Sequence, residues 1–302
     1  MNIAYRFRIY PTEEQKILLG KTFGCCRFLY NQMLNDKIRE YEKTKKMLKN
    51  TPAMYKKEYP FLKEVDSLAL ANVQLHLEKA YKNFFRDPKI GFPRFKSKHH
   101  SKNSYTTNVV NGNILVESKR IRLPKLKWIA MKKHREPAEG LRLKSVTVSM
   151  EPSGKYFASL LYEGYSCENQ AAGPDYSTAK ILGIDYAMQG MAVFSEKVET
   201  EEAGFFRKNE KRLAREQRKL SRCVRGSHNY ELQKKKVARC HEKIRNQRRD
   251  HLHKLSRKIA DGYDAAAVED IDMKAMGQCL HFGKSVQDNG YGMFREMLDY
   301  KL

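Results

Sequence analysis

Two carboxylates stand at the ends of short apolar segments of the kind that form buried strands. Asp185 follows ILGI and Glu269 follows AAAV. An ionised carboxylate is costly to bury without a partner. If the two strands are neighbours, the pair supplies the hard oxygen ligands that Mg²⁺ prefers, and such a site can hydrolyse phosphodiesters. Either acid could be a helix N-cap or a salt-bridge partner, and for Asp185 alone that is the better explanation. The pair, separated by a basic segment, favours a metal site.

Other reactive residues near this pair form no recognisable motif. Asp270 is expected to point away from Glu269 if the strand continues, and Asp272 is expected to cap a turn. His241 falls on the apolar stripe of its segment, which predicts a packed side chain. The six cysteines show no Cys-x-x-Cys spacing, so neither a zinc ribbon nor a disulfide framework is indicated. The sequence also contains no phosphate-binding loop.

Positive charge is the strongest signal in the composition. The chain has 59 Lys and Arg against 35 Asp and Glu, a net charge of +24. Such a charge attracts polyanions, and no apolar run reaches the ~18 residues of a membrane-spanning helix. We therefore expect a nucleic-acid-binding protein of the cytoplasm, rather than a protein whose basic surface has no ligand. Residues 207–258 hold 20 basic and 5 acidic residues, and the candidate contacts there are Arg207, Lys211, Arg215 and Arg248.

Two N-terminal segments also combine cations with apolar residues. Residues 2–10 alternate between the two, which predicts a half-buried strand with Arg6 and Arg8 on its cationic face. In GFPRFKSKHH (91–100), phenylalanines and cations interleave, so that rings could stack on bases while cations meet phosphates. The alternative is that the rings only anchor a loop. The candidate contacts in this segment are Arg94, Phe95, Lys96 and Lys98.

The elements around these segments are predicted from turns and caps. Thr12-x-x-Gln15 is a capping box, so a helix is expected to begin there, to break at Gly24 and to resume over 25–43. Two short helices around a glycine are typical of a helix-turn-helix, and a packed helical hairpin explains the same pattern. A further helix is expected over 67–86. Turn signals then predict short strands that join strand 2–10 in a small barrel or sandwich; they cover 114–116, 120–123, 145–150 and 156–162.

The last third of the chain has an α/β pattern. Residues 166–179 are small and polar and are expected to be a linker. A β-hairpin with a turn at Gln189-Gly190 is expected next, followed by long basic helices that end at Gly262 and by a short strand.

Six segments, in this order, resemble the TnpB/OrfB proteins of insertion sequences, which are relatives of type V CRISPR effectors. They are RFRIYPTEEQ (6–15), FGCCRFLYNQML (23–34), GFPRFKSK (91–98), GIDYAMQGMAVFS (183–195), AVEDIDMKAM (267–276) and FREMLDYKL (294–302). The resemblance spans nearly the whole chain.

The resemblance implies a multidomain α+β and α/β fold. A wedge-type β-barrel (1–11 and 96–165) would hold an inserted helical recognition domain (12–95), and after the linker (166–179) a partial RuvC domain of the RNase H-like fold would cover 180–302. It also implies a protein that binds a guide RNA, opens a matching double-stranded DNA beside a short motif and cuts it with Mg²⁺. Asp185 and Glu269 match the first two catalytic acids of this family.

The chain departs from the family pattern at its end. Family members continue into a four-cysteine zinc ribbon and a third catalytic aspartate, whereas this sequence ends at Leu302, and Ala187 stands where the family usually has Gly. We therefore expect a C-terminally truncated member without a zinc site, which binds RNA and DNA but has weakened or lost cleavage. The alternatives are an active Mg²⁺-dependent RNA-guided endonuclease, with Asp288 or Asp299 as a replacement acid, and a non-functional transposase-associated remnant.

Overall fold

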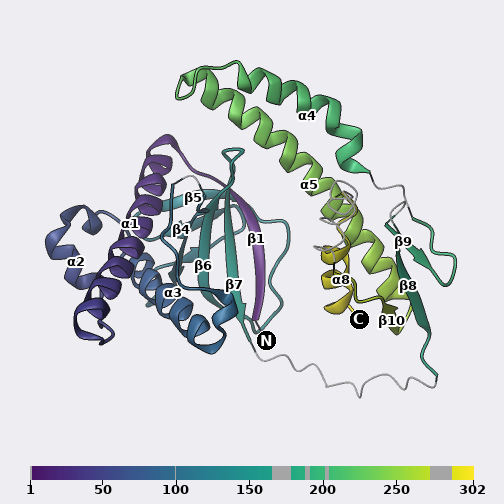
Figure 1. Cartoon of the computed structure of the whole chain (residues 1–302), viewed down its shortest axis with the longest axis horizontal. Coiled ribbons are helices and arrows are strands. Elements are labelled where there is room, and N and C mark those ends of the chain that lie inside the picture. The colour runs from purple at the N-terminus through teal and green to yellow at the C-terminus, as the bar shows by residue number, and fades with distance from the viewer. Residues whose placement is uncertain (1, 99, 165–177, 188–190, 201–203, 273–287) are drawn as a thin grey trace. The chain divides into compact units, whose positions relative to one another are not determined.

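The computed structural model describes residues 2–98, 100–164, 178–187, 191–200, 204–272 and 288–302. The chain divides into two compact units, Met1–Cys167 and Glu168–Leu302 (Figure 1). Each unit has its own buried core. The expected turn at Gln189-Gly190 lies outside the described residues, as does nearly all of the expected linker.

The N-terminal unit is built on a seven-stranded sheet in which every pairing is antiparallel. The strand order is β2-β6-β7-β1-β5-β4-β3, so the first strand of the chain lies in the centre and β2 and β3 form the edges. The strands are β1 (Asn2–Tyr10), β2 (Asn103–Asn108), β3 (Leu115–Val116), β4 (Arg120–Leu123), β5 (Lys127–Lys132), β6 (Arg142–Met150) and β7 (Tyr156–Glu163). Along β7 buried and half-buried residues alternate, as one face of the sheet packs on the core.

The first helix is continuous, and the predicted break at Gly24 is wrong. Helix α1 runs from Glu13 to Thr44 and begins with the predicted capping box of Thr12 and Gln15. Gly24 is exposed and a Cβ there would meet nothing. The glycine therefore destabilises the helix only through its low helix propensity, by about 1 kcal/mol relative to alanine. The buried stripe on both sides of Gly24, which includes Phe23 and Cys25, outweighs that cost.

Two further helices follow in the same unit, α2 (Pro52–Glu58) and α3 (Ser67–Arg86), and α1 and α3 both pack against β2. The buried Asp66 joins α3 to the sheet, because its carboxylate accepts hydrogen bonds from the Leu68 amide (3.0 Å) and from the Thr107 hydroxyl (2.5 Å). It therefore caps the helix and satisfies a polar group of β2.

The C-terminal unit has a three-stranded sheet of order β10-β8-β9. Strands β8 (Ile181–Ala187) and β9 (Met191–Phe194) are antiparallel, and β10 (Ala265–Val268) joins β8 in parallel. After β9 the chain forms two helices, α4 (Phe205–Ser221) and α5 (His228–Gly262), which pack together as a hairpin before the chain continues into β10. Helix α8 (Tyr291–Asp299) packs on α5 (Figure 1). The core includes Leu182, Leu252, Ile259 and Phe294. His241, expected to be packed, is exposed on α5.

Candidate functional site

Strand pairing brings Asp185 and Glu269 together. In the parallel ladder Ala265 pairs with Ile181 and Val268 pairs with Ile184, so the next residues in register are Glu269 and Asp185. Paired residues of parallel strands project to the same face of a sheet. Both acids therefore stand at the same point of the sheet, where β10 ends, and both are exposed to solvent.

The two carboxyl groups interact directly. A hydrogen bond with Asp185 raises the pKa of Glu269, and partial desolvation and the negative charge of Asp185 add to the effect. Two carboxylates this close share a proton more readily than they both ionise. A divalent cation would remove that repulsion, so the pair suits a hard metal ion such as Mg²⁺. Among the described residues no cluster of three or more His, Cys, Asp or Glu side chains accompanies it.

Aromatic and basic residues of α8 lie near the pair. Tyr291 is buried and its ring packs edge-on against Tyr186, with the centroids 5.0 Å apart. Burial raises the pKa of the Tyr291 hydroxyl, and the negative charges of Glu269 and Asp185 also raise it. Arg295 donates a hydrogen bond of 2.6 Å to Asp270, so the acid that follows Glu269 has a cationic partner of its own.

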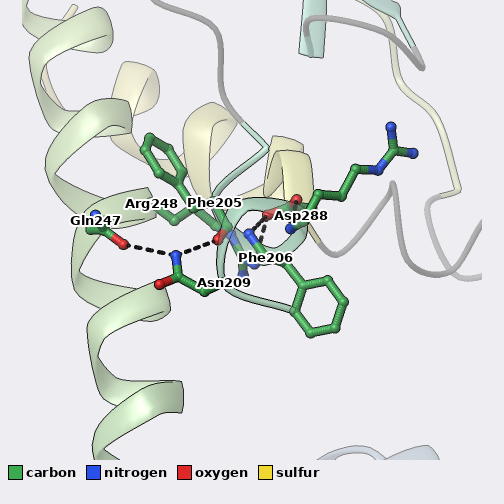
Figure 2. A network of polar contacts seen from close by, with 7 residues as sticks. Phe205, Phe206, Asn209, Gln247, Arg248 and Asp288 are labelled. Atoms are coloured by element: carbon green, nitrogen blue, oxygen red, sulfur yellow. Dashed lines mark hydrogen bonds and ion pairs between the residues drawn. The ribbon is translucent and has the colours of Figure 1, made fainter. Parts of the chain in front are cut away.

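Asp288 is held in a structural network that the sequence did not reveal. Its side chain is 3% exposed, and its carboxylate accepts hydrogen bonds from the Phe206 (2.8 Å) and Arg207 (3.4 Å) amides at the start of α4. The Arg248 guanidinium pairs with it at 3.4 Å, and Asn209 bridges the same helix start to Gln247 (Figure 2). Asp288 thus neutralises the positive N-terminal end of α4. Arg248 was predicted to lie on the basic surface, but it belongs to this network and only 19% of its side chain is exposed.

The other predicted contacts on α4 lie at its surface. Arg207, Lys211 and Arg215 are all exposed. Arg215 also approaches Glu216, with 3.5 Å between the charged atoms, a contact that contributes little at this exposure.

In the N-terminal unit, Arg6 and Arg8 project from β1 to solvent. The Arg6 guanidinium pairs with Glu151 at 2.6 Å and lies 3.9 Å from the centre of the Phe157 ring. The Arg8 guanidinium lies 4.9 Å from the centre of the Tyr10 ring. Both cations are thus held over aromatic rings, Arg6 with a competing acid and Arg8 beside a half-exposed tyrosine.

The segment 94–98 divides into exposed and half-buried residues. Arg94 and Lys98 are exposed, and Phe95 is 55% exposed. Lys96 instead lies with its ammonium 3.9 Å from the centre of the Tyr30 ring, and burial lowers the pKa of that ammonium.

Sequence reasoning missed a basic hollow between α1, α3 and β2. Its volume is about 290 Å³. Its basic lining residues are Arg27 of α1, His76 of α3, and Lys96 and Lys102 of the segment before β2. Lys96 was among the predicted contacts, but no spacing rule connects it with Arg27 and His76, so the sequence did not predict that they line one hollow. The hollow could accept an anion, and the Lys96 charge lowers the pKa of His76, which burial already depresses.

No helix within the described part of the chain is long and apolar enough to span a membrane.

Comparison with known proteins identifies the chain's relatives. The family model OrfB_IS605, described as "Probable transposase", matches residues 164–279, and a model described as "Helix-turn-helix domain" matches residues 1–46, which here contain one continuous helix. Two proteins match 99% of the chain. A "Putative RNA-guided DNA endonuclease" of Streptomyces pristinaespiralis is 31% identical and is covered over 74% of its length. The "Putative RNA-guided DNA endonuclease InsQ" of Escherichia coli K12 is 30% identical and is covered over 77%.

A solved Cas12f1–sgRNA–target DNA complex also contains a similar chain, at 13% identity and a TM-score of 0.29, covering 99% of this chain and 83% of that one. The two full-length matches and the two family models agree with the resemblance that the six sequence segments carry. The chain belongs to the TnpB/OrfB family of IS605-type insertion-sequence proteins.

Proposed function

We propose that the chain is an RNA-guided DNA-binding protein whose Asp185–Glu269 pair is the metal-binding part of an endonuclease site. The observation that carries the proposal is the parallel register of β8 and β10, which sets these two carboxyl groups within hydrogen-bonding reach. The relatives, described as putative RNA-guided DNA endonucleases, supply the reaction class.

The domain assignment follows from the same family. We assign residues 180–302 to an RuvC-like domain, because a β-hairpin whose first strand pairs in parallel with a strand that follows long helices fits the RNase H-like fold implied by the family resemblance. We assign residues 1–11 and 96–165 to a wedge barrel, with 12–95 as the inserted helical recognition domain. The seven-stranded antiparallel sheet, interrupted after β1 by α1 to α3, supports this division.

Asp185 and Glu269 would hold Mg²⁺ through their carboxylate oxygens, and the bound ion would supply the Lewis acid for phosphodiester hydrolysis. The exposure of both acids leaves the site open to a strand of DNA. Since two carboxylates repel a phosphate, the surrounding protein must supply positive charge. The exposed cations of α4 belong to the same unit, and the net charge of +24 favours the binding of a polyanion by the chain as a whole.

The nucleic-acid partners are proposed to be a guide RNA and a double-stranded target DNA. Base pairing would supply sequence recognition, and the protein would contact mainly backbones, which needs many cations and few specific side chains. The charge of the chain fits that division of labour better than it fits a small-molecule substrate.

We further propose that cleavage is weak. Mg²⁺ affinity depends on the number and charge of its ligands, and the pair provides two carboxylates. Of the two candidates for a replacement acid, Asp288 is already committed to the α4 N-terminus and to Arg248, and Asp299 lies at the C-terminal end of α8. On this account the protein binds its DNA target but cuts it inefficiently, as a guided repressor would. The second candidate function is a fully active endonuclease, favoured by the close approach of Asp185 and Glu269.

The test is a cleavage and binding assay on the ribonucleoprotein. The chain would be co-expressed with the DNA that flanks its gene, purified with its RNA and given a guide-matched duplex and Mg²⁺. Asp185→Ala should abolish any cuts and leave DNA occupancy nearly unchanged, whereas Asp250→Ala, which removes the same charge from the exposed face of α5, should change neither. If no RNA copurifies, or if guide-matched and unrelated duplexes bind equally, the proposal is wrong.

A further inference from the structure

The end of α3 and the loop after it carry an exposed group of aromatic rings. Phe85 is 66% exposed and Phe92 is 45% exposed. Together with Phe84 and the buried Tyr81 beneath them, they form what we call the aromatic ledge. Exposed large apolar side chains gathered in one place mark an interaction surface more often than an accident of packing.

Contacts among the rings hold the ledge in place. The Phe92 ring packs edge-on against Tyr81 and against Phe84, with both centroid distances 5.5 Å. The Phe85 ring stacks on Tyr81 at 6.2 Å with an interplanar angle of 24° and touches Phe84 at 5.4 Å. Because Tyr81 is buried in the core, these contacts fix Phe92 and Phe85 while large parts of both rings remain in solvent.

The backbone around the ledge is also anchored. Asp87 caps α3 and accepts a hydrogen bond of 3.0 Å from the Lys89 amide. Further along, Asn31 of α1 forms two hydrogen bonds with the backbone of Lys96, at 2.8 and 2.9 Å. The segment that carries Phe92 is therefore tied down at both ends, and a ligand would meet a preformed surface.

Cations surround the rings. Between residues 79 and 98 the sequence has one acidic residue, Asp87, and seven basic ones. Four of the basic residues next to the ledge are exposed: Lys82, Arg86, Lys89 and Arg94. Rings that are open on one face and bordered by positive charge are what unpaired nucleobases and their phosphates require. A second copy of the chain would place like charges against each other, which disfavours self-association through this surface.

We infer that the aromatic ledge binds unpaired bases of RNA, with Phe85 as a stacking platform. The inference rests on the proposed function, since it takes the resident RNA as the occupant. That RNA has unpaired nucleotides from the start, whereas duplex DNA has none until it is opened. Sequence-specific contacts with RNA are made mostly at such unpaired, splayed-out bases, stacked on aromatic side chains.

The experiment measures binding of oligouridine, which forms no stable secondary structure, to the full chain without Mg²⁺ or target DNA. Phe85→Leu, which keeps the apolar character but removes the ring, should weaken oligouridine binding about tenfold, within the range for one stacked base. Phe85→Trp should restore it. Duplex RNA should bind the wild type and both variants alike. Phe61→Leu is the matched control, because Phe61 is 42% exposed and belongs to a different aromatic group, with Phe28 at 5.3 Å.

Ultraviolet cross-linking provides an independent readout. Uridine should become attached to the tryptic peptides 83–86 and 90–94, which contain the exposed rings. An unchanged oligouridine affinity in Phe85→Leu, or an equal loss for duplex RNA, would overturn the inference. An equal loss for oligothymidine would overturn the assignment to RNA, and a concentration-dependent dimer lost in Phe85→Leu would assign the ledge to self-association. Because cleavage is not measured, an inactive Asp185–Glu269 site cannot cause any of these results.

Discussion

Glu269 follows the last residue of β10 and lies beside Asp185 of β8, so that their carboxyl groups share a hydrogen bond that raises the pKa of Glu269. Two ionisable groups placed this way by parallel strands are poised to bind a cation, because the cation replaces the shared proton. The pair is also open to solvent, as access by a long polyanion requires.

The raised pKa of Glu269 predicts how metal binding depends on pH. Protons compete with the metal for the pair, so Mn²⁺ affinity should increase as pH rises above the usual glutamate pKa of about 4.3 and through the raised value. Glu269→Gln should lower the affinity by roughly tenfold or more and flatten the pH dependence. Electron paramagnetic resonance titration of Mn²⁺ measures both, with Asp250→Asn as a control. An affinity that falls with rising pH would contradict the prediction.

The Asp288 network predicts a stability effect without a metal effect. Asp288→Ala should lower the free energy of unfolding of residues 168–302 by about 2–3 kcal/mol, because it uncaps α4 and leaves Arg248 without its carboxylate. Adding Arg248→Met should recover part of the loss. Denaturant unfolding followed by circular dichroism gives the stability, and the same samples should keep wild-type Mn²⁺ affinity. A loss of metal binding with stability unchanged would make Asp288 a ligand.

The N-terminal unit depends on Asp66 in a similar way. Asp66→Ala should cost about 2 kcal/mol, since both the α3 cap and the Thr107 partner are lost. Asp66→Asn keeps an oxygen for the Leu68 amide and should cost less. Thermal unfolding of the three proteins provides the comparison, and equal stability of the alanine variant and the wild type would show that the cap contributes nothing.

The proximity of the two acids and much of the fold were accessible from the sequence because local patterns and tertiary packing agree there. The apolar segments that end in Asp185 and Glu269 predicted a pair of strands, and the structure places the two acids side by side. The turn signals before 156–162 and the capping box at Thr12 likewise gave a strand and a helix start. Strand β5 was missed, because KWIAMK is only six residues long and its four apolar residues stand in a row, without the alternation typical of a half-buried strand.

Errors arose where distant contacts decide the outcome. Gly24 suggested a break, but the packing of α1 on the core outweighs the helix propensity of one exposed glycine. Arg248 looked like one of many cations on a basic helix. Its partner lies 40 residues further along the chain, and no spacing rule connects the two.

The charge of the chain predicts a steep dependence of binding on salt. A protein that contacts 6–10 phosphates loses about 10³–10⁵ in affinity between 50 and 200 mM salt, and the net charge of +24 supports contacts on that scale. Replacing the exposed Lys211 and Arg215 with Gln should reduce the slope of log affinity against log salt by about two if both residues contact phosphate. Fluorescence anisotropy with a guide-matched duplex measures the slope. A flat affinity would contradict this account of binding.

The most direct test of the metal site maps the ion on the protein chain. Fe²⁺ would be substituted for Mg²⁺, and radicals generated with ascorbate and peroxide would cut the backbone next to the bound ion. The account predicts cuts close to Asp185 and Glu269 that disappear with excess Mg²⁺ and in Asp185→Asn. Cuts that persist in Asp185→Asn, or that fall in other segments, would contradict the claim that these two carboxylates form the metal site.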